Sequence, residues 1–391
     1  MRKLLVLMAL CALVVMLGSA SFAQTVYVLT NDDNPAGNTA TAFVLNTATG
    51  ALTQAAVLTT GGTGLGGGFF AATSEAVAQN EACVFVADTG SDDIAAFSKA
   101  TGFKKVGNYS NAALSFSALG AGGSISVTPN GKFLYGGYSG SENIGAWSVA
   151  SNCALNFIAA YVPSTGADTF SPLKVTPSGS ALIVPSIDLS LATLFSINAT
   201  TGALTEVNNV NWSTNTTCES VGCYPSGLDI TENNSLVVFG NPTLTNNGIY
   251  ALTASIGASG LSNPQAFTLT NSANVGNDNV PWFTSQSYPT GNGGMLFGMS
   301  GYNNPFIQSG IVAAEVSSTK GITVVNSTAI TTPDDFLGSI RTHELILVVA
   351  IYPNTINTYK IAANGSLTLL KSTTDAQGAG LLSLDLYPET R

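Results

Sequence analysis

The chain has 391 residues, of which 9% are charged and 45% are apolar, with 41 glycines and 15 prolines. This composition is typical neither of a disordered chain nor of a bundle of long helices. Twelve Lys and Arg against 22 Asp and Glu give a net charge of -10. So few cations exclude a nucleic-acid groove and a patch for anionic membranes.

The N-terminal segment over residues 1–23 is typical of a signal peptide. Arg2 and Lys3 precede an apolar run, and small residues follow up to Ala23, in the order that a signal peptide and its cleavage site require. The run is shorter than the roughly 20 residues of a membrane-spanning helix. We expect cleavage after Ala23, a secreted or periplasmic location, and one domain over residues 24–391 with no membrane span.

Four cysteines remain after this segment, in a compartment where disulfides form. Four cysteines allow three pairings. Cys218 and Cys223 lie close together in the sequence, which favours a local bridge and leaves Cys83 to pair with Cys153. Free buried thiols are the alternative.

A turn signal recurs seven times along the chain and predicts the architecture. In each copy a small or polar residue precedes the central residue, and an apolar strand follows; the central residues are Gly50, Gly102, Cys153, Gly202, Gly260, Gly321 and Gly365. The copies are on average about 52 residues apart, which is too short for a domain and typical of a repeat.

A second repeated pattern marks another hairpin in each unit. Residues 126–135, 174–183 and 229–238 each place an apolar residue and Thr before a polar turn and an apolar run. Such short apolar runs between turns indicate strands. Four strands per repeat and seven repeats predict an all-β fold, a seven-bladed β-propeller. A β-sandwich also has short strands but no seven-fold period.

The two ends of the chain predict how the ring closes. Residues 383–388 have the pattern of the inner strand at 124–129, whereas the first strand, at 26–29, begins at the second-strand position. We therefore expect the C-terminal strand to complete the first blade, which removes an exposed sheet edge.

Several of these motifs resemble the seven-bladed lactonase family, whose named member is 6-phosphogluconolactonase. The resemblance is carried by residues 128–135 (TPNGKFLY), 140–144 (GSENI) and 201–205 (TGALT). It implies a propeller fold and lactone hydrolysis. Family members place His after Pro at the entrance to the inner strand, but Leu173 follows Pro172 here and Ser226 follows Pro225. The family's catalytic residues therefore cannot be transferred to this chain.

In a propeller, the loops between second and third strands share one face with the links between blades. We expect these loops to form an acidic rim that binds a ligand through Asp32, Asp33, Asp92, Asp93, Tyr138, Asp188, Asn241, Tyr302 and Asn303. Their oxygens suit Ca²⁺ or sugar hydroxyls, and tyrosine rings stack on sugars. The loops contain no Lys, Arg or His, so nothing positive is expected to offset this charge, and a phosphorylated ligand would be repelled. The alternative is that each Asp and Asn only forms its turn.

Two interpretations of function follow. The preferred one is an exported lactonase-like propeller that binds a carbohydrate, a cation or a protein partner through the acidic face. The alternative is a hydrolase that opens an uncharged sugar lactone, with Asp88 or Glu142 as the base that activates water. Neither requires a cofactor, although Ca²⁺ is a candidate ligand. Arg341 and His343 form the one cationic cluster that could orient a carboxylate, and a solvated hairpin is its alternative explanation.

Overall fold

The computed structural model describes residues 25–66, 75–77, 82–110, 125–138, 140–166, 173–187, 189–215, 217, 223–231, 235–241, 250–268, 279–288, 294–301, 308–317, 321–333, 337–342, 345–351, 354–379 and 383–387. The predicted signal peptide lies outside these residues. Within them the chain forms seven four-stranded antiparallel sheets and one 3-10 turn, η1 (Lys99–Thr101).

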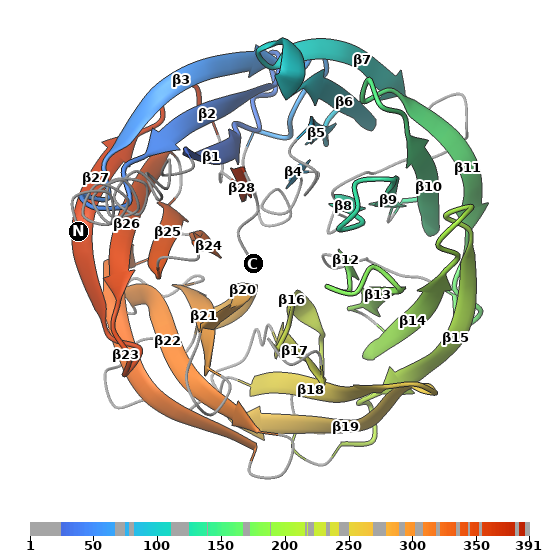
Figure 1. Ribbon diagram of the computed structural model, residues 1–391. Helices are drawn as coiled ribbons and strands as arrows, with labels where there is room; N and C mark the ends of the chain where they lie inside the picture. The colour runs from blue at the N-terminus through green and yellow to red at the C-terminus, as the bar shows by residue number, and fades with distance from the viewer. Residues whose placement is uncertain are drawn as a thin grey trace, which may run out of the picture.

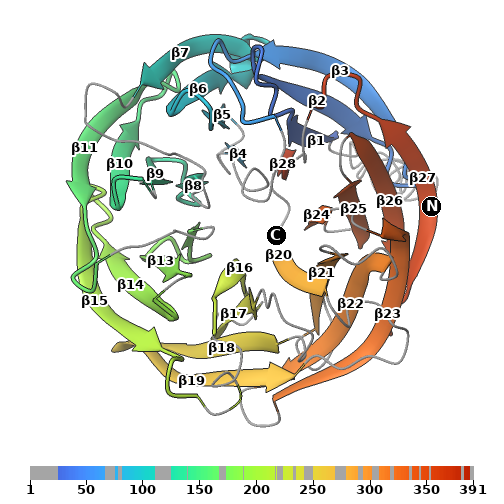
Figure 2. The ribbon, with the colours of Figure 1, turned by 180° about the vertical axis from the view of Figure 1, so that it is seen from behind.

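Figures 1 and 2 show the seven sheets arranged in a ring, each with one strand near the centre and one at the circumference. We call the four strands of a sheet inner, second, third and outer, and give them in that order. The sheet that joins the two ends of the chain has β28 (Ser383–Tyr387), β1 (Val26–Asn31), β2 (Thr39–Leu45) and β3 (Leu52–Thr59). The next has β4 (Glu75–Val77), β5 (Cys83–Asp88), β6 (Asp93–Ser98) and β7 (Lys104–Ser110).

The other five sheets follow in chain order. The third has β8 (Ile125–Val127), β9 (Phe133–Tyr138), β10 (Asn143–Val149) and β11 (Leu155–Tyr161). The fourth has β12 (Lys174–Val175), β13 (Ala181–Ser186), β14 (Leu191–Ile197) and β15 (Leu204–Asn211). The fifth has β16 (Ser226–Ile230), β17 (Leu236–Asn241), β18 (Tyr250–Gly257) and β19 (Gly260–Thr268). The sixth has β20 (Asn279–Tyr288), β21 (Gly294–Gly301), β22 (Gln308–Ser317) and β23 (Gly321–Pro333). The seventh has β24 (Leu337–Arg341), β25 (Ile346–Ile351), β26 (Thr355–Ile361) and β27 (Leu367–Thr374).

The turn signal that recurs in the sequence lies between the third and the outer strand of every sheet. Its central residue has a positive φ in all seven copies, between 69° at Cys153 and 111° at Gly260. Glycine adopts this conformation without steric cost because it has no Cβ. The turn signal therefore repeats because each of these turns needs a residue with a positive φ. The predicted seven-fold pattern of sheets is confirmed.

The hydrophobic core is divided among the contacts between neighbouring sheets. The described chain has seven clusters of buried apolar side chains, and each contains residues of two adjacent sheets. One of them joins Val28 of β1 to Val348 of β25, at opposite ends of the chain. Strand β28 also pairs antiparallel with β1, with Val28 opposite Leu386. None of the helical segments in the described residues is long and apolar enough to cross a bilayer.

Candidate functional site

The residues predicted to bind a ligand come from loops that join second strands to third strands. We call these loops, together with the links between sheets, the loop face. Asp32 and Asp33 follow β1, Asp92 precedes β6, Asp93 is its first residue, and Glu142 precedes β10. Asp188, Tyr302, Asn303 and the side chain of Asn241 lie outside the described residues, so their predicted roles stay predictions.

Three of these acidic residues adopt the left-handed backbone conformation of a tight turn. Asp33 has a φ of 50°, Asp92 of 56° and Glu142 of 54°. Non-glycine residues rarely adopt this region, and Asp is among those that tolerate it best. A turn-forming role accounts for the position of each residue, whatever else the side chain does. The carboxylate of Glu142 is exposed.

Asp32 lies in a buried cluster that spans two neighbouring sheets. Its Oδ2 accepts hydrogen bonds from the hydroxyls of Thr39 and Thr41. Thr30 Oγ1 lies 2.7 Å from Asp32 Oδ1 and 2.9 Å from Oδ2 of Asp375, which follows β27. Both carboxyl groups are fully buried. One hydroxyl has one proton to donate, so Thr30 cannot satisfy two ionised carboxylates.

A proton held by this pair resolves the hydrogen bonding. If Asp32 Oδ1 carries it, Asp32 donates to Thr30 and Thr30 donates to Asp375. Burial, with the nearby charge of Asp375 as the second cause, raises the pKa of Asp32 from 3.8 to about 7. The pair therefore links two sheets through a shared proton, and its burial keeps it away from a ligand at the surface.

Asp88 lies in a second buried network at the next contact between sheets. Asn38 Nδ2 donates to Asp88 Oδ1 and to Asn31 Oδ1, both at 2.8 Å, and Asn31 Nδ2 donates to the Ala87 carbonyl at 2.9 Å. Asp88 Oδ2 has no hydrogen-bond partner among the described residues. Burial, followed by interactions with Asp93, raises the pKa of Asp88 from 3.8 to about 8. Burial therefore favours the neutral form of Asp88 over the carboxylate that would act as a base.

The glycine-rich link after β3 packs against Asp33. The backbone N–H of Leu65 and the hydroxyl of Thr89 donate to Asp33 Oδ1, at 2.8 and 3.1 Å. A Cβ on Gly64 would lie 2.2 Å from the Asp33 carbonyl carbon. Only glycine permits this approach, so the link seals the carboxylate beneath it.

The remaining predicted residues of the described loops also make local contacts. Asp93 Oδ1 accepts a hydrogen bond of 3.0 Å from Asn108 Nδ2 of β7. Tyr138 is fully buried, with its ring centroid 6.3 Å from that of Trp147. The Tyr138 ring thus fills the contact between sheets rather than offering a surface on which a sugar could stack.

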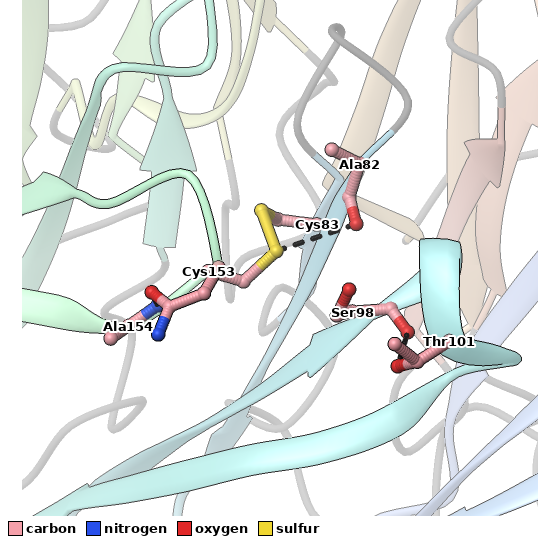
Figure 3. Close-up of a disulfide and its surroundings, with 7 residues drawn as sticks. Ala82, Cys83, Ser98, Thr101, Cys153 and Ala154 are labelled. Carbon is pink, nitrogen blue, oxygen red and sulfur yellow. Dashed lines mark hydrogen bonds between the residues drawn. A yellow bond between two sulfur atoms is a disulfide. The ribbon is translucent and has the colours of Figure 1, made fainter.

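The cysteine prediction is confirmed for one pair. Cys83, which begins β5, bonds to Cys153 in the β10–β11 turn of the adjacent sheet, with their Cα atoms 5.5 Å apart. Figure 3 shows the bridge, with Cys153 Sγ also directed at the Ala82 carbonyl. Cys223 is disulfide-bonded, whereas Cys218 lies outside the described residues, as does His343. Arg341 donates from Nη1 to the Thr342 carbonyl.

The inner strands contain a charged pair that the sequence analysis did not single out. Lys174 is the first residue of β12, and its Nζ lies 2.7 Å from Oδ1 of Asp229 in β16. Strand β12 begins at the loop face, so the prediction that nothing positive lies near this face is wrong. The sequence could have indicated this pair, because Lys174 and Asp229 occupy the same position in the second repeated pattern. Each directly precedes the apolar residue and Thr of that pattern. In the described residues no group of three or more His, Cys, Asp and Glu side chains could hold a metal ion.

The comparisons with known proteins agree with this architecture. A family model described as lactonase, seven-bladed β-propeller, matches residues 24–220. A candidate 6-phosphogluconolactonase from Bacteroides fragilis has a TM-score of 0.66 at 15% identity, covering 94% of this chain and 100% of its own. A similar candidate from Bacteroides uniformis has a TM-score of 0.68 at 10% identity, covering 93% and 100%.

The periplasmic gluconolactonase of Pseudomonas aeruginosa has a TM-score of 0.62 at 12% identity, covering 93% of this chain and 100% of its own. No curated protein matches the sequence. At these identities the solved structures establish the fold, while the family model extends over half of the chain. The seven sheets, the repeated turns and this match together show that the chain belongs to the seven-bladed β-propeller lactonase family.

Proposed function

We propose that this protein is a hydrolase that opens an uncharged sugar lactone. The observation that carries the proposal is the lactonase family match over residues 24–220. Proteins of the same fold are named as gluconolactonases or candidate 6-phosphogluconolactonases. These findings favour hydrolysis over the binding function, which the missing family histidines and the shortage of cations had favoured.

The charge of the described residues supports a neutral substrate rather than a phosphorylated one. The inner strands contain two cations in the described chain, Lys174 and Arg341. Lys174 is paired with Asp229, and Arg341 ends its strand at the side away from the loop face. Phosphate recognition usually relies on several Arg, Lys or backbone N–H donors. A sugar lactone without phosphate does not need several such groups.

Lactone hydrolysis needs a base for water and a donor for the developing oxyanion. Of the two carboxyl groups predicted as the base, Asp88 is buried and its pKa is raised to about 8 by burial. Glu142 is exposed on the loop face. We therefore assign the base to Glu142. Any Ca²⁺ at the loop face would have a supporting role, which treatment with EDTA tests.

We also infer that the protein is exported as one domain over residues 24–391 after cleavage of residues 1–23. The disulfide between Cys83 and Cys153 supports an oxidising compartment. The pairing of β28 with β1 supports closure of the ring by the C-terminal strand, which pairs the edge of β1 that would otherwise be exposed.

The test uses the mature chain with glucono-1,5-lactone and with its 6-phosphate, and measures acid release above the spontaneous rate. We expect turnover of the neutral lactone, a kcat/KM at least tenfold lower for the phosphate, and loss of kcat in Glu142→Gln. The matched control is Glu206→Gln. Glu206 lies in the outer strand β15, and its carboxylate accepts a hydrogen bond from the hydroxyl of Ser164, which follows the outer strand β11. Binding of gluconate or Ca²⁺ without turnover of either lactone would reject hydrolysis in favour of the binding function.

A further inference from the structure

The Lys174–Asp229 pair lies on the inner side of the ring. The residues before and after each partner in its strand are buried in a core between sheets, so each partner points the other way. Leu173 and Val175 are 3% and 2% exposed and belong to the core between two sheets. Successive side chains of a strand point to opposite faces. Lys174 therefore points away from that core, toward the axis of the ring, and 25% of its side chain is exposed.

Asp229 obeys the same rule in the next inner strand. Leu228 and Ile230 are buried in the neighbouring core, so Asp229 points toward the axis of the ring, as Lys174 does. Its position is equivalent by register, since Lys174 pairs with Ile183 and Asp229 pairs with Val238, each the third residue of its second strand. The ion pair therefore bridges two adjacent inner strands at the same level along them.

Backbone contacts fix the position of Lys174 from its other side. Ser126 Oγ, at the equivalent level of β8, accepts a hydrogen bond of 3.1 Å from the backbone N–H of Val175. Three consecutive inner strands are thus tied together around Lys174. A lysine side chain usually samples many rotamers, whereas here one end is held by the strand and the other by Asp229.

We propose that the Lys174 ammonium is the oxyanion donor for lactone hydrolysis and that Asp229 is its positioning residue. This inference rests on the hydrolase function proposed above. An ammonium group has three N–H donors. In the described chain Asp229 receives one of them, and the Lys174 side chain is 25% exposed, so the others can reach a ligand near the axis of the ring.

The reaction balances with water as the only co-reactant. Glu142, the base assigned above, takes a proton from water, and the hydroxide so formed adds to the lactone carbonyl carbon, whose oxygen becomes an oxyanion that accepts a hydrogen bond from Lys174. The intermediate then collapses, the bond between the carbonyl carbon and the ring oxygen breaks, and the ring oxygen takes the proton back from Glu142. The new carboxylic acid releases its own proton to solvent, so the products are the open-chain hydroxy-carboxylate and one H⁺. Lys174 retains its proton throughout, so its partner Asp229 orients it without entering the reaction.

The competing explanation is that the pair only connects two inner strands. The two roles separate in kinetics, because an oxyanion donor acts mainly in the transition state and changes kcat more than KM. Removal of one such donor typically lowers kcat about 10²–10³-fold. An ion pair that is only structural would change the melting temperature and leave the turnover of folded molecules unchanged.

The experiment compares Lys174→Met with Lys132→Met, an exposed lysine in the β8–β9 turn on the opposite face, using glucono-1,5-lactone. We expect Lys174→Met to lower kcat at least 100-fold with KM changed less than threefold, and Lys132→Met to match the wild type. Asp229→Asn should lower kcat about tenfold, and Asp229→Glu should restore most of it. A double variant, Lys174→Met with Asp229→Asn, leaves no unpaired charge and replaces the single variant if that one does not fold.

The outcomes distinguish this inference from the proposed function. Suppose that the wild type hydrolyses the lactone and that Lys174→Met, or the double variant, keeps a kcat within threefold of the wild type. This result overturns the role of Lys174 and leaves the hydrolase function standing. Absence of turnover in the wild type rejects the hydrolase function, and this inference with it.

Discussion

The shared proton of Asp32 and Asp375 predicts an unusual dependence of stability on pH. In the folded chain burial raises the pKa of Asp32 from 3.8 to about 7. Between these two values the folded state keeps a proton that the unfolded state has lost. Stability is therefore greatest at acid pH, falls as pH rises through about 7, and is level above that value.

The substitution that isolates this effect is Asp32→Asn. The amide nitrogen would donate to Thr30 Oγ1, which then donates to Asp375, so the hydrogen bonds of the protonated state are kept. For one group with these pKa values, linkage gives a loss of about 2–3 kcal/mol between pH 5 and pH 8.5 in the wild type. The variant lacks this loss. The difference in free energy of unfolding, variant minus wild type, should therefore increase by about 2–3 kcal/mol from pH 5 to pH 8.5.

The assay is urea unfolding at several pH values between 5 and 8.5, with the free energy of unfolding extrapolated to water. Glu142→Gln is the matched control, because its side chain is exposed, and it should keep the wild-type dependence. Equal pH dependence in Asp32→Asn and in the wild type would refute the shared proton. A variant that is destabilised most at high pH would do the same, since it would mean that an ionised Asp32 stabilises the fold.

Three further predictions test the same contacts between sheets. Cys83→Ala with Cys153→Ala opens a loop whose ends are 70 residues apart. The free energy of unfolding measured with urea should fall by about 4 kcal/mol, and a decrease below about 1 kcal/mol would contradict this prediction. Gly64→Ala places a Cβ against the backbone of the β1–β2 loop and should destabilise the chain by about 1–3 kcal/mol; the control Gly257→Ala, with no atom closer than 3.8 Å, should not match it. Asp88→Asn should become more stable relative to the wild type in urea unfolding as pH rises from 5 to 8, because burial raises the pKa of Asp88 to about 8. A difference in the free energy of unfolding that stays constant with pH would be inconsistent with a neutral Asp88.

The architecture was accessible from the sequence because its cause is local. A left-handed turn between the third and outer strands favours glycine wherever it recurs, so the period of Gly50, Gly102 and their equivalents reports the sheets directly. The pairing of Cys83 with Cys153 was also predicted from the sequence, because Cys218 and Cys223 lie close enough to pair with each other and leave these two.

The chemistry of the acidic residues depended on contacts that no local pattern records. Thr30 and Asp375 are 345 residues apart in the sequence, and their contact exists only because the first and last sheets are neighbours in the ring. The loops that contain Asp32 and Asp88 are short and polar, which predicts exposure. Asp88 is covered by the glycine-rich link, where a Cβ on Gly62 would lie 2.4 Å from Asp88 Oδ2, and Asp32 is buried among Thr30, Thr39 and Thr41.

Lys174 and Asp229 fall between these two cases. Their shared place in the second repeated pattern, and the alternation of side chains along a strand, are properties of the sequence. That the alternate face is the inner wall of a ring, and that neighbouring strands bring an ammonium within 2.7 Å of a carboxylate, are decided by the tertiary structure. The sequence by itself determined which residues repeat and which turns they form. Only the packing of one sheet against the next decided which side chains meet, because that packing joins segments with no local relation.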